Sequence, residues 1–204
     1  CSRCVRACAD TYVAYPITPA SLIYSYASRR FPMILPAPDE ITALQWMAGL
    51  SAAGRLPVTA TSFPGLALMV ESINMAYMME LPMLIVLVQR LGPSTGTATA
   101  GAQDDLRFAH GIISGGYPVP TFCIGDIEDC WRLPPVALRT AIELRTPVVL
   151  LTSKEMVMTE RSFELSKLGD VEPVEREYGS GAGTYRPYAA GEAETPEFFP
   201  IGDD

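Results

Sequence analysis

Residues 83–96, which read MLIVLVQRLGPSTG, decide the fold of this chain. The apolar run before Gln89 has the length and the β-branched content of a strand that is buried on both faces, as in a parallel sheet. Arg90 follows at the carboxyl end of the predicted strand. The turn after it combines glycines, which allow close backbone approach, with hydroxyl side chains, namely Gly92, Ser94, Thr95 and Gly96. Because ligands of open α/β sheets bind at the carboxyl ends of strands, this turn is a candidate binding edge.

Short apolar segments and helical patterns alternate along the rest of the chain. Further strands are predicted at residues 11–15, 33–35, 58–62, 121–124 and 148–151. Helices are predicted at residues 19–30, 41–53, 66–79, 103–109 and 127–145. This alternation predicts an α/β fold with a doubly wound, mostly parallel sheet and helices on both faces. Pro134 and Pro135 remove two backbone donors, so the last helix is expected to kink or split there.

Charge divides the chain into two parts. Residues 1–154 hold 11 acidic and 11 basic side chains, whereas residues 155–204 hold 12 acidic and 4 basic ones, so the tail carries the whole net charge of −8. We expect one domain over residues 1–154 and an acidic linker or wrapping arm over residues 155–204 without a core of its own. Residue 1 is not methionine, and we expect a fragment at both ends, with a further domain after the arm.

Composition argues against several classes of partner. The chain has no basic cluster for nucleic acid and no apolar run near the roughly 20 residues that span a bilayer, so a cytoplasmic protein is expected.

The spacing of Cys1, Cys4 and Cys8 suits an iron–sulfur or zinc site. The favoured interpretation is that these cysteines pack as small apolar residues on one side of a terminal helix. We therefore expect no metal site in this chain.

Glu40 stands at a second candidate edge, at the end of the stretch Pro36-Ala37-Pro38-Asp39-Glu40. The prolines disfavour a helix, and Asp39 can cap a helix that begins at Ile41. The Glu40 carboxylate therefore lies at a predicted strand-to-helix junction. The alternative is an exposed first-turn glutamate that only favours the helix dipole.

Two more turns present hydroxyl groups after predicted strands. In Tyr15-Pro16-Ile17-Thr18-Pro19, Thr18 is suited to cap a helix and Pro19 is suited to its first turn. In residues 59–65, which read TATSFPG, hydroxyls precede a proline-glycine turn and a helix. Each turn alone is weak evidence for a site.

Together, YPITP (15–19), PDE (38–40), TATSFPGLALM (59–69) and QRLGPSTG (89–96) follow one another on successive strand ends. This array resembles the pyrimidine-binding domain in the α subunit of 2-oxoacid:ferredoxin oxidoreductases. The resemblance runs from about residue 5 to residue 153, and the tail is similar to that family's link to a following domain. It implies a thiamine diphosphate-binding fold of the pyrimidine type over residues 1–154.

The resemblance also implies roles for individual residues. Glu40 would hydrogen-bond a ring nitrogen of the aminopyrimidine and favour the imino tautomer that removes the thiazolium C2 proton. Arg90 would grip the carboxylate of a 2-oxoacid, with a structural ion pair as the alternative, and Thr18 would lie near substrate and cofactor unless it is only a helix cap. The implied cofactor-binding set is Pro16, Ile17, Glu40, Thr61, Ser62 and Phe63, and the implied cleft-lining set is Gly92, Ser94, Thr95 and Gly96.

The implied reaction is oxidative decarboxylation of a 2-oxoacid to acyl-CoA and carbon dioxide, with reduction of ferredoxin. The chain lacks the Gly-Asp-Gly motif that usually marks a metal-diphosphate site. The resemblance therefore implies a partner β subunit that binds the diphosphate and Mg²⁺ and carries an iron–sulfur cluster, with coenzyme A as a further substrate. The QRLGPSTG form favours 2-oxoglutarate, with pyruvate or another 2-oxoacid as alternatives.

Some positions depart from the family pattern. Phe63 stands where the family usually has glycine, and Ser114-Gly115-Gly116 stands where many members carry a His-Gly-acidic element, so His110 is given no catalytic role. A catalytically decayed assembly module is one alternative. A nucleotide-binding dehydrogenase domain is another, although no G-x-G-x-x-G follows the first strand.

Overall fold

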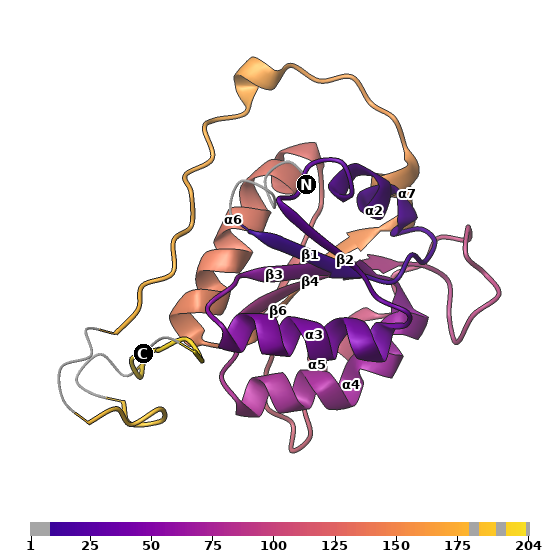
Figure 1. The fold of residues 1–204 in the computed structure, drawn as a ribbon. Coiled ribbons are helices and arrows are strands. Elements are labelled where there is room, and N and C mark those ends of the chain that lie inside the picture. Colours follow the sequence, from indigo (N-terminus) through magenta and orange to yellow (C-terminus); the bar gives the residue numbers. More distant parts are fainter. Residues whose placement is uncertain (1–8, 180–183, 191–194, 203–204) are drawn as a thin grey trace.

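The computed structural model describes residues 9–179, 184–190 and 195–202, and the cysteine cluster at Cys1, Cys4 and Cys8 lies outside them. A six-stranded sheet, ordered β2-β1-β3-β4-β6-β5, forms the centre of the molecule (Figure 1), and all its neighbouring strands are parallel. The strands are β1 (Thr11–Ala14), β2 (Met33–Pro36), β3 (Pro57–Thr61), β4 (Met83–Gln89), β5 (Thr121–Cys123) and β6 (Pro147–Ser153). The predicted parallel α/β sheet is confirmed.

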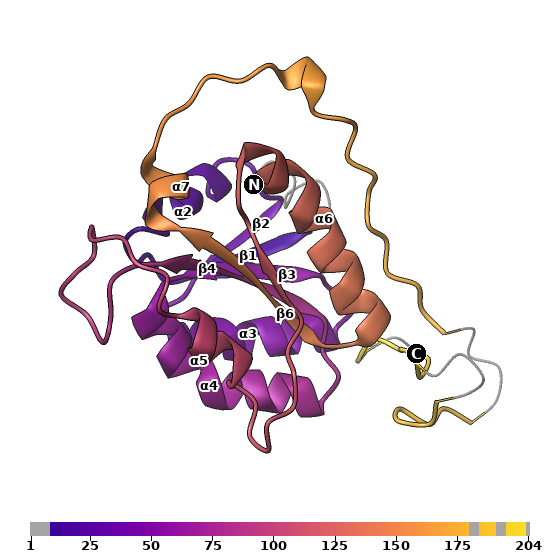
Figure 2. The ribbon, with the colours of Figure 1, turned by 180° about the vertical axis from the view of Figure 1, so that it is seen from behind.

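Helices cover both faces of the sheet. On one face lie α2 (Ser21–Ala27), α6 (Ile127–Leu144) and α7 (Lys154–Met158). The opposite face carries α3 (Glu40–Ala52), α4 (Phe63–Met78) and α5 (Leu106–His110), as the front and back views both show (Figures 1 and 2). The predicted double layer of helices is therefore confirmed.

Strand β4 shows why the sheet needs both layers. Leu84, Val86 and Val88 belong to the core beneath α2 and α6, whereas Ile85 and Leu87 belong to the core beneath α3 and α4. Successive side chains of a strand point to opposite faces, so an unbroken apolar run fits only a strand that is covered twice.

The strand order places a topological switch point between β1 and β3. From β1 the chain crosses to β2 on one side, and β3 then pairs with the other side of β1. Loops that leave the sheet in opposite directions open a crevice above the carboxyl ends of the strands at such a point, where ligands of these sheets bind. The turns that follow β1 and β3 contain Thr18 and Ser62.

Three helix expectations need correction. Helix α2 begins at Ser21, and its N-cap, Ala20, has no side-chain hydrogen bond, so Thr18 is not the helix cap and Pro19 lies ahead of the first turn. The carbonyl of Thr18 is bound instead by the side chains of Ser62 and Arg90, which follow β3 and β4, and this keeps the segment out of the helix. Helix α6 is not split, because it runs through Pro134 and Pro135 to Leu144.

Helix α7 was not predicted at all. Its five residues are too few for an apolar periodicity to show in the sequence. The Ser153 hydroxyl caps the helix by accepting from the amide of Met156 at 3.1 Å. The proposed domain boundary at residue 154 falls on the first residue of α7 and stays a prediction.

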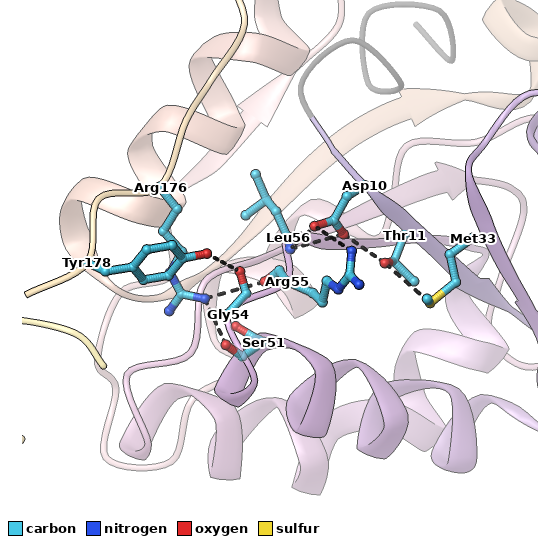
Figure 3. A network of polar contacts seen from close by, with 9 residues as sticks. All are labelled: Asp10, Thr11, Met33, Ser51, Gly54, Arg55, Leu56, Arg176 and Tyr178. Carbon is cyan, nitrogen blue, oxygen red and sulfur yellow. Dashed lines mark hydrogen bonds and ion pairs between the residues drawn. The ribbon is translucent and has the colours of Figure 1, made fainter. Parts of the chain in front are cut away.

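After α7 the chain swings away from the sheet and returns along the outer side of α6 (Figures 1 and 2). Figure 3 shows its return contacts at the end of α3: Arg176 Nη1 donates to the carbonyl of Ser51 at 2.7 Å, and Tyr178 donates to the carbonyl of Gly54 at 2.9 Å. The Arg176 guanidinium also lies 3.4 Å from the ring centroid of Phe198. These contacts fasten the arm to the amino-terminal edge of the sheet, away from the switch point.

Replacing Arg176 with alanine tests whether these contacts hold the arm. The change removes a part-buried hydrogen bond and a cation–π contact, so we expect a loss of about 1–2 kcal/mol in the free energy of unfolding. Hydrogen exchange measured by mass spectrometry should also become faster over residues 195–202. The control is Arg186→Ala, at an exposed arginine of the same arm. Equal exchange in both variants would contradict the expectation.

In the described part of the chain, no helix has the length and apolar character needed to cross a membrane.

Candidate active site

Three strand ends meet at the backbone carbonyl of Thr18. This oxygen accepts one hydrogen bond from Arg90 Nη1 at 2.5 Å and another from Ser62 Oγ at 3.2 Å. Thr18 follows β1, Ser62 follows β3 and Arg90 follows β4, so one acceptor ties together the turns on both sides of the switch point. The predicted association of these residues at one edge is seen in the structure.

Arg90 is held in a nearly water-free position, with 2% of its surface exposed. Besides the Thr18 carbonyl, its guanidinium reaches Thr95 Oγ1 at 3.4 Å from Nη2, while Nε has no hydrogen-bond partner among the residues described. None of the ion pairs within that part of the chain involves Arg90, so the structural ion-pair alternative finds no support. A buried cation without an ion pair is costly unless a ligand shares its charge, which makes Arg90 a candidate anion-binding group.

Glu40 is the first residue of α3 and is also buried, with 5% of its surface exposed. Asp39 caps the helix as predicted, because its carboxylate accepts from the amide of Thr42 at 2.7 Å. Burial raises the pKa of Glu40, and the charge of Asp39 raises it further, against a lowering hydrogen bond from the residue's own amide. The alternative of an exposed glutamate in the first turn is therefore wrong, because the Glu40 side chain is buried.

Gly65 leaves room for the Glu40 side chain. A Cβ at Gly65 would lie 2.8 Å from Glu40 Oε1 and only 2.1 Å from Thr61 Oγ1. The first turn of α4 thus lies so close to the Glu40 carboxyl that only a glycine fits at position 65. Glu40, Thr61 and Gly65 pack together at the strand ends, and we call this group the carboxyl wall.

Other predicted residues lie farther from these contacts. Phe63 is half-buried, and its ring packs edge-on against Phe108 of α5, with 5.3 Å between the ring centroids. Pro16 is exposed, whereas Ile17 packs against the core beneath α2. The aromatic contact gives Phe63 a packing role that the sequence did not reveal.

The turn after β4 is mostly open to solvent. Ser94 and Gly96 are exposed, and of the predicted cleft-lining side chains in this turn only Thr95 contacts Arg90. The amide of Leu91 donates to the carbonyl of Ala100 at 2.8 Å and closes the base of the turn. The cleft-lining role of Gly92, Ser94 and Gly96 stays a prediction.

Two residues of this region were missed as individual site residues. Gly65 is part of the quoted TATSFPGLALM stretch, and its requirement for a missing side chain shows only when α3 and α4 are packed together. Asp105 belongs to Gln103-Asp104-Asp105-Leu106, and only 3% of its surface is exposed. No local pattern marks an aspartate for burial.

A cavity of about 960 Å³ lies elsewhere, between the carboxyl end of α4, the end of α6 and the arm. Its lining includes Tyr77, Arg145 and Tyr188, but none of the predicted site residues. The predicted site residues therefore lie away from this cavity.

Comparison with known proteins agrees with this geometry. Residues 3–200 match the family described as "Pyruvate flavodoxin/ferredoxin oxidoreductase, thiamine diP-bdg". The chain belongs to this family. The alternative of a nucleotide-binding dehydrogenase domain is therefore wrong.

Relatives in the family are named as oxidoreductase subunits. The 2-oxoglutarate synthase subunit KorA of Archaeoglobus fulgidus is 33% identical over 176 residues, covering 84% of this chain and 51% of that protein. The ketoisovalerate oxidoreductase subunit VorB of Methanothermobacter thermautotrophicus is 37% identical over 147 residues, covering 70% of this chain and 42% of that protein. The chain thus spans about half, or less, of the length of these relatives.

A solved structure shares the fold. The 2-oxoglutarate:ferredoxin oxidoreductase of Magnetococcus marinus, with 2-oxoglutarate, coenzyme A and succinyl-CoA bound, superposes with a TM-score of 0.87 at 32% identity. The match covers 98% of this chain and 37% of that one. The described architecture is therefore that of the family.

Adding a methyl group at Gly65 should disturb the carboxyl wall. Gly65→Ala is expected to lower the free energy of unfolding by about 1–3 kcal/mol, because the new Cβ overpacks against Thr61 and Glu40. Gly49→Ala in α3 is the matched control, since its Cβ meets nothing within 4 Å, and it should instead gain about 0.5–1 kcal/mol. Urea unfolding measures both. The expectation fails if the two variants are equally stable.

Removing the charge of Glu40 should stabilise the chain at neutral pH. Burial raises its folded pKa above 4.5, so the stability that the protonated form contributes is present below pH 4.5 and is lost as the pH rises through the folded pKa. Glu40→Gln should therefore gain on the order of 1 kcal/mol at neutral pH and little near pH 4. Chemical unfolding at both pH values tests this, with exposed Glu71→Gln as control. A less stable Glu40→Gln protein at neutral pH would be the opposite result.

Proposed function

We propose that this chain supplies the pyrimidine half of a composite thiamine diphosphate site in a 2-oxoacid:ferredoxin oxidoreductase. The enzyme would convert a 2-oxoacid and coenzyme A to acyl-CoA and carbon dioxide and reduce ferredoxin. The observation that carries the proposal is the buried carboxyl of Glu40 on a glycine-lined wall, at the same sheet edge as the buried guanidinium of Arg90. Family membership supports it.

The residues of the carboxyl wall fit an aminopyrimidine ring. Glu40 has no ion pair and no hydrogen bond to another side chain in the described structure, so its carboxyl is free to bind a ring nitrogen. Its raised pKa favours sharing a proton with that nitrogen, and the burial of Glu40 strengthens the bond. Thr61 at the end of β3 and Gly65 in the first turn of α4 lie beside the carboxyl. When bound, thiamine diphosphate supplies the carbanion stabilisation that decarboxylation requires.

Arg90 would bind the carboxylate of the substrate. A guanidinium presents paired N–H groups to a carboxylate, and burial makes such charge-assisted hydrogen bonds stronger. The bond from Nη1 to the Thr18 carbonyl fixes the orientation of the guanidinium, while Nε is without a partner in the described structure. Thr18 would lie beside the same substrate, held by its backbone and not by a helix cap.

The rest of the active site would come from a partner. We infer a β subunit that binds the diphosphate and Mg²⁺ and carries an iron–sulfur cluster, as the resemblance to the family and the missing Gly-Asp-Gly motif imply. Among substrates we favour 2-oxoglutarate, after which several relatives are named. Pyruvate and branched 2-oxoacids are the alternatives, the latter because of the ketoisovalerate relative.

The deciding experiment uses the full-length subunit co-expressed with its β subunit. Reduction of a viologen dye is measured with thiamine diphosphate, coenzyme A and a panel of 2-oxoacids. Glu40→Gln should lower kcat by at least about 100-fold, the usual contribution of a general acid–base group. Arg90→Gln should mainly raise KM for the 2-oxoacid, by about 10- to 100-fold for a lost charge-assisted pair.

Exposed Gln45→Ala on α3 serves as the control and should match the wild type. Equal rates in wild type and Glu40→Gln would refute the role of Glu40. No activity in any protein, with cofactor and cluster bound, would favour a decayed assembly module.

A further inference from the structure

Ser62 stands at a helix-capping position, but its side chain does not cap the helix. It is the N-cap of α4, with an extended backbone, and in the described structure its hydroxyl makes no hydrogen bond to the first turn of that helix. Serine is favoured at this position because its oxygen can accept from an amide of the first turn. Helix α4 therefore lacks a stabilising contact that this residue type usually supplies.

The Ser62 hydroxyl binds the end of another strand instead. Its Oγ donates to the carbonyl of Thr18 at 3.2 Å, and none of the Ser62 surface is exposed. Arg90 Nη1 donates to the same oxygen at 2.5 Å. A carbonyl oxygen has two lone pairs, so these two donors saturate it. Ser62 thus holds in place the acceptor that Arg90 uses.

The guanidinium of Arg90 has little else to fix its orientation. Its other printed hydrogen bond runs from Nη2 to Thr95 Oγ1 at 3.4 Å, which is long for an N–H···O bond, and Thr95 is exposed. Nε has no partner among the described residues. The orientation of the guanidinium therefore depends chiefly on the Thr18 carbonyl.

We propose that Ser62 is a positioning residue for the 2-oxoacid, which orients the Arg90 guanidinium through the carbonyl of Thr18. The inference rests on the proposed function of Arg90 as the group that binds the substrate carboxylate. A guanidinium binds a carboxylate best through two parallel N–H groups, so a guanidinium free to turn binds it less tightly. The cofactor contact that the family resemblance implies for Ser62 is a separate prediction.

Ser51 on α3 offers a matched control. Like Ser62 it has no exposed surface, and its hydroxyl donates to a backbone carbonyl, that of Pro82, at 2.7 Å. Pro82 directly precedes β4, so this bond lies at the amino-terminal end of the strand, whereas Arg90 follows its carboxyl end. A general effect of losing a buried hydroxyl should appear in both Ser→Ala variants, but only Ser62→Ala should affect the 2-oxoacid.

Calorimetry tests the proposal directly. 2-Oxoglutarate is titrated into the complete enzyme complex depleted of thiamine diphosphate, so that a contact between Ser62 and the cofactor cannot influence the result. Ser62→Ala should raise Kd by about three- to tenfold, as for the loss of one neutral hydrogen bond, and Ser51→Ala should match the wild type. In an Arg90→Gln background, Ser62→Ala should have little further effect, because the hydroxyl acts through the guanidinium.

Steady-state kinetics of the holoenzyme give a second readout. Ser62→Ala should raise KM for 2-oxoglutarate by a similar factor, with kcat changing less. Ser62→Thr keeps the hydroxyl donor and should keep KM near the wild-type value. If Ser62→Ala does not fold, Ser62→Cys takes its place in both measurements, because a thiol is close in size and a weaker donor.

The outcomes separate this proposal from the proposed function of Arg90. An unchanged Kd in Ser62→Ala, or an equal rise in Kd in the wild-type and Arg90→Gln backgrounds, overturns the positioning role of Ser62. A wild-type complex that binds no 2-oxoglutarate, or an Arg90→Gln complex that binds it as tightly as the wild type, would instead refute the proposed function of Arg90.

Discussion

A buried guanidinium needs acceptors, and the hydrogen bond from Arg90 to the carbonyl of Thr18 is the contact on which the site depends. Leaving a desolvated cation without acceptors would cost several kcal/mol, so the turn after β1 must stay irregular and present its carbonyl to β4. This is why α2 begins only at Ser21. Ser62 adds a second donor to the same oxygen and brings the end of β3 into the arrangement.

The carboxyl wall depends on a different constraint, which is the close packing of α3 against α4. Gly65 permits the first turn of α4 to touch Glu40 and Thr61. The burial that results raises the pKa of Glu40, so the features that suit the carboxyl for catalysis also make it unfavourable for folding. Active sites commonly hold such perturbed groups, and the compact sheet supplies the stability that compensates for them.

The arm and the site occupy opposite edges of the sheet. Arg176 and Tyr178 bind carbonyl groups at the end of α3, whereas Glu40 stands at its beginning. The arm therefore leaves the switch point uncovered in the described structure. In the described structure, the arm therefore does not block a partner subunit from the edge formed by the carboxyl ends of the strands.

The sequence by itself determined the sheet, its two layers of helices and the edge at which Glu40 and Arg90 lie. These features follow from local periodicity, from turn chemistry and from an unbroken apolar strand, all of which act between near neighbours in the chain. It did not determine that Thr18 acts through its carbonyl, that Phe63 packs on Phe108 or that α6 runs through two prolines. Nor did it reveal the burial of Asp105. Those outcomes depend on packing, burial and hydrogen bonding between segments that are distant in the chain, which leave no periodic trace in the sequence. Only the tertiary structure therefore decides them.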